Sequence, residues 1–538
     1  MMTVDTTADS AARTVRDYVR AVFTRGRNPM APADFAPDWD DAPSKYKTYP
    51  AVPRLAAPGW TGGPLGTLPG LLAAGPDVDG PPWTADAISA LAGLAYGVQD
   101  RRLAANWNQD LHNRVHYPGA VWGRATASGG GMYPLEIYWV AGAGAAVRPG
   151  VYHFHTGHRG WQRLATGDRV DAVRAACLGD PGAARAGQFL VVTTRFWKNA
   201  FKYHDFCVHV VTQDLGALLG SWHLIARGLG RRLRPVLWFA DEAVNAELGL
   251  ATDEESALAV VPLQAPDGPA RTAPDPAGEV AAVAFERSRR VLRLDRVTAV
   301  HRSMLVHEEP RPPAPPAPAD IASTVDGVVL PELPAGRWET DLTVALRRRR
   351  SSFGRFGLQD RLTAADLGGV LGAAATAGDL PDDLGGPPRT GLHVLVNEVD
   401  GVPAGAYAYD PAGRRLRQIR VAPMAATLQR AYFLTNYNLA QAGAVVAISA
   451  PLDAALEHYG PRGYRLVNAE AGAAAQLAYV AAAALGVGCG AVLGFDNEVI
   501  DDALELTGTG HHSVLFLLLG QDRATVGAID SPVAPPAG

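Results

Sequence analysis

Three successive glycines, Gly129–Gly131, follow Ser128 and lead through Pro134 into the apolar run 137–140. Glycine reaches positive φ at no steric cost and lets a ligand approach the backbone, and a serine hydroxyl can form a hydrogen bond. The strand predicted at 137–140 would hold such a turn rigid. Taken alone, the stretch is equally typical of a glycine-rich turn without a ligand. It is therefore a candidate cover for a flat ligand, to be weighed with the rest of the chain.

A second stretch whose residues could bind a ligand is basic. Residues 346–356 contain four successive arginines, Arg347–Arg350, followed by Ser351 and Ser352. Guanidinium groups with hydroxyls beside them suit a phosphate, which accepts bidentate, charge-assisted hydrogen bonds. A solvated charge run or a nucleic-acid patch is the alternative, but the formal net charge of the chain is −5. We therefore expect one defined anion at this stretch and no nucleic acid.

Two dipeptides could move protons, Lys202-Tyr203 and His458-Tyr459. A lysine beside a tyrosine can act as a base when burial or a neighbour lowers the lysine pKa. A surface pair at the end of a strand is the more common role of such a dipeptide. A glycine-rich turn at 488–495 could aim backbone N–H groups at a ligand edge, or could be an ordinary loop after a helix.

The elements that must position these residues are predicted twice along the chain. In the first half Thr84 caps a helix, strands are predicted at 137–140, 151–154 and 189–194, and a helix covers 215–230. The second half repeats this layout. Its elements are a helix capped by Thr363, strands at 392–396, 406–409 and 445–449, and a helix that ends at Gly486.

Landmarks of the first half recur 255 or 256 residues later. The pairs are Gly150 and Gly405, Tyr203 and Tyr459, and Gly230 and Gly486. Such agreement over three elements indicates two tandem copies of one α+β domain, which form a pseudo-dimer within a single chain.

The predicted organisation has five parts. A helix is expected at 11–23 within the first of them. The parts are an N-terminal extension at 1–45, a first domain at 46–305, a proline-rich linker at 306–335, a second domain at 336–530 and a tail at 531–538.

The two copies carry different chemistry. The second copy has no Ser-Gly-Gly-Gly turn, and the first has no basic run before Thr84. The basic run would hold the phosphate end of a ligand, and the turn of the other copy would face its planar end. We therefore expect one composite site per chain, across the interface between the domains.

Composition excludes several classes of protein. Hydrophobic residues make up 48% of the 538 residues and charged residues 19%, which is typical of a soluble globular protein. Three widely spaced cysteines favour neither disulfides nor a metal site, and they fit a cytoplasmic location. The most apolar segment, 469–495, is interrupted by Glu470 and Gln476, so a buried helix is favoured over a membrane span.

Together these residues resemble the nitroreductase superfamily of flavin enzymes, and more closely its SagB/McbC-type branch. That branch contains FMN-dependent dehydrogenases of azole-containing ribosomal peptides. The resemblance covers residues 46–305 and 336–525. The motifs that carry it are Tyr46–Pro50 with Pro53-Arg54, Ser128–Glu136, Gly150–Phe154, Lys202-Tyr203, Arg350–Phe356, Tyr459–Arg465 and Ala484–Cys489.

The resemblance implies a fold of two nitroreductase-like domains, each a mostly antiparallel sheet flanked by helices, with FMN at their interface. It also implies a role for each motif. The implied phosphate ligands are Arg347, Arg349, Arg350, Ser351, Ser352 and Arg523. The implied contacts of the flavin ring are Ser128, Gly129, Gly130 and the backbone N–H of Gly494.

In the resembling enzymes a Lys-Tyr pair is catalytic. His458 replaces that lysine in the second copy, and His204–Cys207 replaces the usual glycine-rich stretch after the pair in the first copy. Either Lys202 with Tyr203 or His458 with Tyr459 could therefore face the flavin. We favour Lys202 and Tyr203.

The activity implied by the resemblance is the oxidation of peptide thiazolines or oxazolines to aromatic azoles. A base, Lys202 or Tyr203, would remove the Cα proton while a hydride leaves Cβ for the flavin, with dioxygen as the final acceptor. The expected partners are an azoline-containing precursor peptide and the cyclodehydratase of the same pathway, and further oligomerisation is open. The alternatives are a flavin enzyme of this fold acting on a quinone, a nitro compound or a peptide Cα–Cβ bond, and a non-catalytic scaffold subunit.

Overall fold

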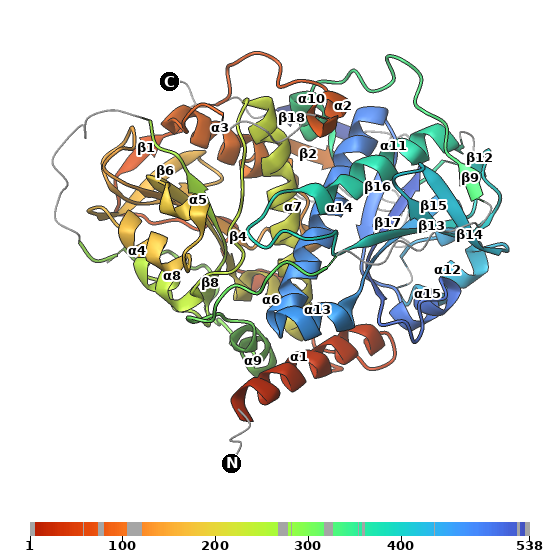
Figure 1. The fold of residues 1–538 in the computed structure, drawn as a ribbon, viewed down its shortest axis with the longest axis horizontal. Helices are drawn as coiled ribbons and strands as arrows, with labels where there is room; N and C mark the ends of the chain where they lie inside the picture. The colour runs from red at the N-terminus through yellow and green to blue at the C-terminus, as the bar shows by residue number, and fades with distance from the viewer. Residues whose placement is uncertain are drawn as a thin grey trace.

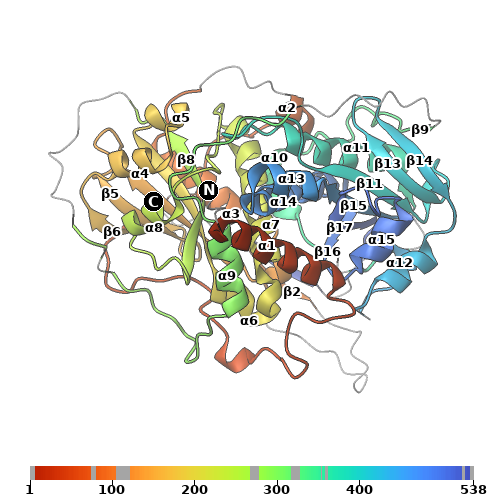
Figure 2. The ribbon, with the colours of Figure 1, turned by 60° about the horizontal axis from the view of Figure 1, so that its bottom comes forward.

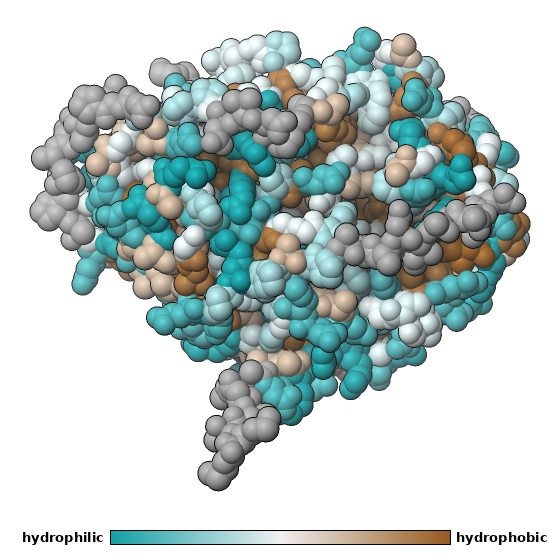
Figure 3. Space-filling model, viewed as in Figure 1, coloured by the Kyte–Doolittle hydropathy of each residue, from teal (hydrophilic) through white to brown (hydrophobic). Residues whose placement is uncertain are grey.

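Two mixed α/β halves lie side by side, with two long helices packed against each other between them (Figure 1). The computed structural model describes residues 6–57, 59–73, 80–104, 121–266, 278–280, 282–316, 327–352, 354–357, 361–434, 436–523 and 528–532. Hydrophilic residues predominate on the face shown in Figure 3, with hydrophobic residues interspersed. Within the described part of the chain, no helix is long and apolar enough to cross a membrane.

The first half is built on a six-stranded sheet in which every neighbouring pair is antiparallel. Its centre is β4 (Leu135–Ala141), a strand that is buried along its whole length. The other strands, in sheet order from β1, are β1 (Arg54–Ala56), β6 (Gly160–Thr166), β5 (Gly150–His155), then β4, β7 (Gln188–Arg195) and β8 (Glu255–Leu263). Helices of this half are α2 (Leu68–Ala73), α3 (Ala85–Tyr96), α4 (Val170–Ala176), α5 (Pro181–Ala184), α6 (Phe196–Tyr203) and α8 (Asp241–Glu247).

The second half is built on a seven-stranded sheet. Its strands in order are β16 (Gly488–Val492), β17 (His512–Gly520), β15 (Ala444–Ala450), β11 (Gly391–Val396), β13 (Gly405–Asp410), β14 (Arg415–Val421) and β9 (Gly327–Val329). Helices of this half are α10 (Leu342–Arg348), α11 (Ala364–Ala375), α12 (Ala425–Ala431), α13 (Leu452–Tyr459) and α15 (Asn497–Ala503).

The two sheets share one strand order. In the first sheet the order is β6-β5-β4-β7-β8, and in the second the corresponding strands run β14-β13-β11-β15-β17. The prediction of two tandem α+β copies is therefore confirmed, and the mostly antiparallel character of both sheets agrees with it. The central strands β4 and β15 form from largely apolar runs, and both are buried along their whole length.

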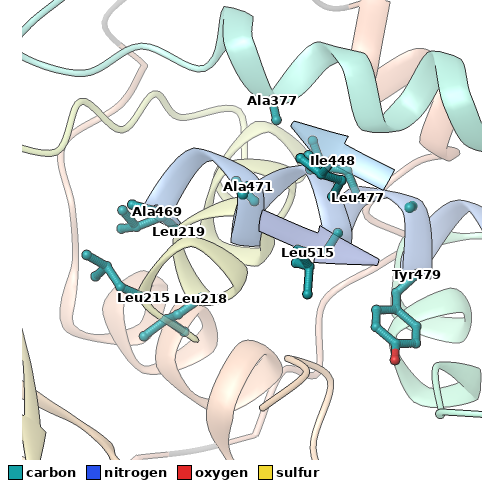
Figure 4. Close-up of a cluster of buried hydrophobic side chains, with 14 of the residues drawn as sticks. Leu215, Leu218, Leu219, Ala377, Ile448, Ala469, Ala471, Leu477, Tyr479 and Leu515 are labelled. Atoms are coloured by element: carbon teal, nitrogen blue, oxygen red, sulfur yellow. The ribbon is translucent and has the colours of Figure 1, made fainter. Parts of the chain in front are cut away.

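The pseudo-dimer is held together by α7 (Cys207–Gly228) and α14 (Arg462–Leu485), and a glycine of each helix lies against the backbone of the other. A Cβ added to Gly216 would lie 1.6 Å from the Ala469 carbonyl oxygen, and one added to Gly472 would lie 1.9 Å from the Gln213 carbonyl oxygen. Gly472 lies 256 residues after Gly216, and Ala469 lies 256 residues after Gln213. The two close contacts are therefore related by the pseudo-twofold symmetry. Leucines of α7 face alanines of α14 beside the crossing (Figure 4).

The N-terminal extension forms a longer helix than predicted. Helix α1 covers Thr6–Thr24 and buries Val15, Tyr18 and Val22. It packs against α9 (Asp295–Ser303) and α15, and Figure 2 shows it lying across both halves. The extension is therefore a part of the folded body that contacts the first and the second half.

Parts of the predicted linker and of the predicted tail form contacts with the two halves. In the linker, the Glu309 carbonyl accepts a hydrogen bond of 2.9 Å from Trp238 Nε1, and Arg311 forms an ion pair of 2.9 Å with Asp383. Strand β18 (Ala528–Pro532) includes Ser531 and Pro532 of the predicted tail, and it pairs with β2 (Asp100–Ala104) of the first half. Strand β3 (Val121–Gly123) completes that small sheet. Linker residues 317–326 and tail residues 533–538 lie outside the described residues.

Candidate active site

A cavity of about 1200 Å³ lies between the halves and is lined by residues of both. Eleven of the predicted site residues line it. They are Ser128, Gly129, Gly130, Lys202, Tyr203, Arg349, Arg350, Ser351, Ser352, Gly494 and Arg523. The remaining three, Arg347, His458 and Tyr459, do not.

The glycine turn forms one wall of the cavity as a short 3-10 turn over Gly129–Gly131. Gly130 and Gly131 adopt φ values of 59° and 67°, a region that glycine enters without strain. A Cβ at Gly130 would lie 2.4 Å from the Tyr203 hydroxyl oxygen and 2.7 Å from Lys202 Nζ. The glycine is therefore required by both its backbone conformation and the side chains packed on it.

Asp214 of α7 holds this turn in place. Its Oδ2 accepts a hydrogen bond of 2.6 Å from Ser128 Oγ, and its Oδ1 accepts one of 2.8 Å from the Gly129 N–H. Ser128 Oγ also accepts a hydrogen bond of 2.9 Å from the Tyr133 N–H. The hydroxyl that we expected to meet a ligand is thus engaged by the protein, and the turn offers mainly its backbone to the cavity.

The carboxyl of Asp214 is buried, and burial raises its pKa to about 7, although the hydrogen bonds from Ser128 and Gly129 favour the charged form. The sequence analysis did not find this residue. The one available signal was an aspartate within the apolar run 208–226, where a charged side chain needs partners.

Lys202 and Tyr203, at the end of α6, pack on the cavity side of the turn. Lys202 Nζ donates a hydrogen bond of 3.4 Å to the Gly130 carbonyl and lies 5.4 Å from the centroid of the Tyr203 ring. Burial lowers the pKa of Lys202, and burial together with the charge of Asp214 raises the pKa of Tyr203. Lys202 is therefore the better base of the pair, and Tyr203 keeps its proton.

His458 and Tyr459, which were also predicted as catalytic residues, do not line this cavity. They end α13, where His458 Nε2 lies 2.8 Å from the Pro313 carbonyl oxygen of the linker. The buried Tyr459 ring lies 5.9 Å from the Arg389 guanidinium. The second pair is thus used for packing between the linker and the second half.

The Arg-Ser run lines the cavity from the second half. Arg349 is 5% exposed, donates a hydrogen bond of 2.7 Å from Nη2 to the Arg124 carbonyl, and has no partner for Nε among the described residues. The Ser352 hydroxyl is also buried without a partner, and Ser351 Oγ lies 2.9 Å from the Tyr479 hydroxyl. A buried guanidinium and a buried hydroxyl with unused hydrogen-bonding capacity suit an anion.

Arg347, which was also predicted as a phosphate ligand, does not line the cavity. It lies in the last turn of α10, where its side chain is exposed, and only its carbonyl serves the site by accepting a hydrogen bond of 3.1 Å from Arg102 Nη2. The helix ends at Arg348, so the arginines before and after its end face different directions.

Gly494 lies at the cavity wall after β16. Its carbonyl accepts a hydrogen bond of 3.0 Å from the Phe433 N–H, and a Cβ there would lie 2.7 Å from Leu434 Cδ1. The close approach of two loops thus requires glycine at this position. Within the described residues, no cluster of three or more His, Cys, Asp or Glu side chains could hold a metal ion.

Comparison with known proteins agrees with this architecture. Residues 393–521 match the model described as the Nitroreductase family. This matched segment lies in the second half of the chain. A crystal structure from Anabaena variabilis, assigned as a nitroreductase, is 22% identical with a TM-score of 0.69, and the match covers 95% of this chain and 99% of that chain. At this identity the likeness establishes the nitroreductase fold over both halves.

Two further structures match less of the chain. One chain of the Escherichia coli microcin synthetase McbBCD complex with truncated pro-MccB17 is 15% identical, with a TM-score of 0.29 over 48% of this chain and 94% of that one. A nitroreductase with bound FMN from Bacteroides fragilis is 13% identical, with a TM-score of 0.21 over 34% of this chain and 89% of that one. No curated protein sequence is significantly similar to the chain.

The second half also has a buried acidic side chain at the position equivalent to Asp214, but there it forms an ion pair with an arginine. Glu470 occupies the position 256 residues after Asp214, and its Oε1 accepts hydrogen bonds of 2.7 Å from the Arg389 N–H and 2.8 Å from Thr390 Oγ1. The Arg389 guanidinium forms ion pairs with both Glu470 and Asp382. The chemistry of the site is thus unequally divided between the copies, as their sequences suggest.

Proposed function

We propose that this chain is an FMN-dependent dehydrogenase that oxidises peptide thiazolines and oxazolines to thiazoles and oxazoles. One observation carries the proposal: one cavity is lined by a glycine turn with a half-buried Lys-Tyr pair from one half and by an Arg-Ser-Ser run from the other. Those are the parts that the sequence resemblance assigns to the flavin ring, the base and the flavin phosphate.

The residues present fit FMN. The unused Arg349 Nε and Ser352 hydroxyl, with Ser351 and the more exposed Arg350 and Arg523, would hold the phosphate. The backbone of Gly129 and Gly130 would lie against the ring, and Gly494 would lie at its edge. A volume of about 1200 Å³ exceeds what a drug-sized ligand fills, so a substrate can enter beside the cofactor.

When bound, FMN would supply a two-electron acceptor for the substrate ring. The protein's own residues would then orient and deprotonate. Lys202 would take the proton from Cα of the azoline, since burial makes its neutral form accessible, while Tyr203 beside it can donate a hydrogen bond. Aromatisation of the azoline makes the reaction thermodynamically favourable. The protein therefore mainly needs to hold the substrate in line with the flavin and to supply a base.

The substrate class rests on the motifs shared with the SagB/McbC-type branch, above all Ser128–Glu136 together with Arg350–Phe356. The proposed partners are therefore an azoline-containing precursor peptide and the cyclodehydratase that makes it, with dioxygen as the final acceptor. A quinone, a nitro compound or a peptide Cα–Cβ bond would be an alternative substrate, and a scaffold subunit would have no turnover.

The test uses the purified full chain with FMN. We expect a yellow protein with a bound-flavin spectrum, and loss of two mass units from an azoline peptide in the presence of dioxygen. If the flavin-loaded protein reduced quinones or nitro compounds but left azolines unchanged, its substrate would be one of those compounds and not an azoline peptide. A protein that does not bind FMN would contradict the proposal and support the scaffold role.

A further inference from the structure

The cavity carries far more positive charge than the cofactor would need. Nine of the described residues that line it are Arg or Lys, whereas two are Asp, in a chain whose net charge is −5. The phosphate of FMN carries about two negative charges near neutral pH. A surplus of cations therefore remains after the cofactor is bound. Such a cavity attracts a second anion, because low-dielectric walls focus the field.

Arg124 is the most unusual of these cations. It is 3% exposed, and its guanidinium stacks on the rings of Tyr133 and Tyr96, with Cζ 4.2 Å and 4.7 Å from their centroids. Among the described residues, Arg124 Nη1 has no hydrogen-bond partner, although it is buried. A buried guanidinium without a counter-charge is costly, and a ligand anion would remove that cost.

Lys45 is a second cation at the same place. Its Nζ lies 5.6 Å from the centroid of the Trp122 ring and 5.9 Å from that of Tyr46, and Arg124 Cζ lies 5.9 Å from the same Tyr46 ring. Burial and, to a smaller extent, the positive charge of Arg124 lower the pKa of Lys45. Two like charges therefore lie beside one tyrosine ring, and an anion between them would reduce their repulsion.

The Arg124 side chain lies on the wall of the cavity that the first half forms, while the Arg124 carbonyl accepts a hydrogen bond of 2.7 Å from Arg349 Nη2 of the second half. Tyr133, on which Arg124 stacks, donates its N–H to Ser128 of the glycine turn. Lys202 donates to Gly130 of the same turn. The residues that fit the phosphate, Arg349–Ser352, come instead from the second half, directly after α10.

We infer that Lys45 and Arg124 bind a carboxylate of the substrate next to the ring that is oxidised, so that the preferred peptides are acidic around the azoline. The inference rests on the proposed function, because it takes the substrate to be a peptide. Carboxylates are the anionic groups of an unmodified peptide, either as Asp and Glu side chains or as the C-terminus. The carboxylate would pair with the exposed Lys45 at the cavity mouth and with the buried Arg124 behind it.

The test compares three azoline peptides that differ only in the residue after the ring, which is Glu, Gln or Lys. With the flavin-loaded full chain at low ionic strength, we expect kcat/KM for the Glu peptide to exceed that for the Gln peptide by about tenfold and to fall as salt is added. Lys45→Met should remove the preference, and Lys45→Glu should reverse the order of the Glu and Lys peptides. The matched control is Arg185→Glu, an exposed charge reversal outside the cavity, which should keep the wild-type order.

The outcomes separate this inference from the proposed function. Equal turnover of all three peptides would overturn the inference and leave the dehydrogenase intact. Turnover of none would contradict the proposed function, and equilibrium binding of the same labelled peptides to wild type and Lys45→Glu would then decide on the anion site alone. A loss of FMN affinity in Lys45→Met without a change in peptide preference would place Lys45 at the cofactor phosphate and also overturn the inference.

Discussion

Ser128 Oγ donates a hydrogen bond of 2.6 Å to Oδ2 of Asp214, across 86 residues of sequence. The same carboxylate accepts the Gly129 N–H, so one buried side chain sets the conformation of the turn that lines the cavity. Because an amide offers one oxygen where the carboxylate offers two, Asp214→Asn should lose one of the two bonds. We expect kcat to fall about tenfold and the visible spectrum of the bound flavin to shift, with a larger loss for Asp214→Leu.

A double-mutant cycle with Ser128→Ala checks the origin of that loss. If Asp214 acts through Ser128, the cycle should show a coupling free energy of about 1–2 kcal/mol. Additive effects on both the spectrum and kcat would show that Asp214 does not act through the serine.

Asp214 should also make stability depend on pH. Burial raises its folded pKa to about 7 from an ordinary value of 3.8, against the hydrogen bonds from Ser128 and Gly129, and Tyr203 and Tyr96 face its charge from α6 and α3. The folded chain thus holds a proton that the unfolded chain releases between these values. The free energy of unfolding should fall as pH rises from about 4 to about 7, by at most about 1.4 kcal/mol per pH unit from this group.

Chemical denaturation of wild type and Asp214→Asn across that pH range measures the effect. The difference in slope between the two proteins isolates the contribution of Asp214, since all other titrating groups are shared. Parallel curves from pH 4 to pH 8 would contradict the raised pKa.

Lys202→Ala should lower kcat by about 10²- to 10⁴-fold, the range for loss of a general base, while FMN stays bound. Tyr203→Phe should cost less, because that residue keeps its proton. His458→Ala is the matched control, since the structure places this counterpart against Pro313 outside the cavity. A full rate in Lys202→Ala, or an equal loss in His458→Ala, would reject the assignment of the base.

Arg349→Ala and Ser352→Ala should weaken FMN binding, by about ten- to a hundredfold for the arginine and less for the serine, because charge-assisted hydrogen bonds are the stronger ones. Fluorescence titration of the apoprotein with FMN measures this. Arg347→Ala removes a neighbouring exposed guanidinium and should change the dissociation constant little. If Arg347→Ala weakened binding as much as Arg349→Ala, net charge rather than position would hold the phosphate.

Gly472→Ala should destabilise the whole chain, because its Cβ would lie 1.9 Å from the Gln213 carbonyl oxygen at the α7–α14 crossing. Overpacking of this kind costs about 1–3 kcal/mol. Gly93→Ala in α3 is the control, since nothing lies within 4 Å of its Cβ position and alanine favours a helix. Thermal unfolding should show a lower Tm for the first variant and an equal or higher one for the second.

Much of the architecture could be predicted from the sequence, because local patterns carry it. The recurrence of landmarks at 255 or 256 residues predicts two copies of one domain, and the caps at Thr84 and Thr363 begin helices where expected. The glycine turn was visible because positive φ at Gly130 and Gly131 requires that residue type. The unequal chemistry of the copies was visible because the basic run and the turn each occur once.

Only the tertiary structure decided which residues far apart in the sequence contact each other. It also decided which side chains at the end of a helix are buried and which are exposed. No local pattern pairs Asp214 with Ser128 or places Lys45 near Arg124, since these contacts depend on how α7 and the segment that contains Lys45 pack on the first half. Arg347 and Arg349 are two residues apart, yet the end of α10 between them turns one to the surface and buries the other. Likewise Lys202 and His458 occupy equivalent positions, and only the packing of the linker on α13 decides which of them lines the cavity.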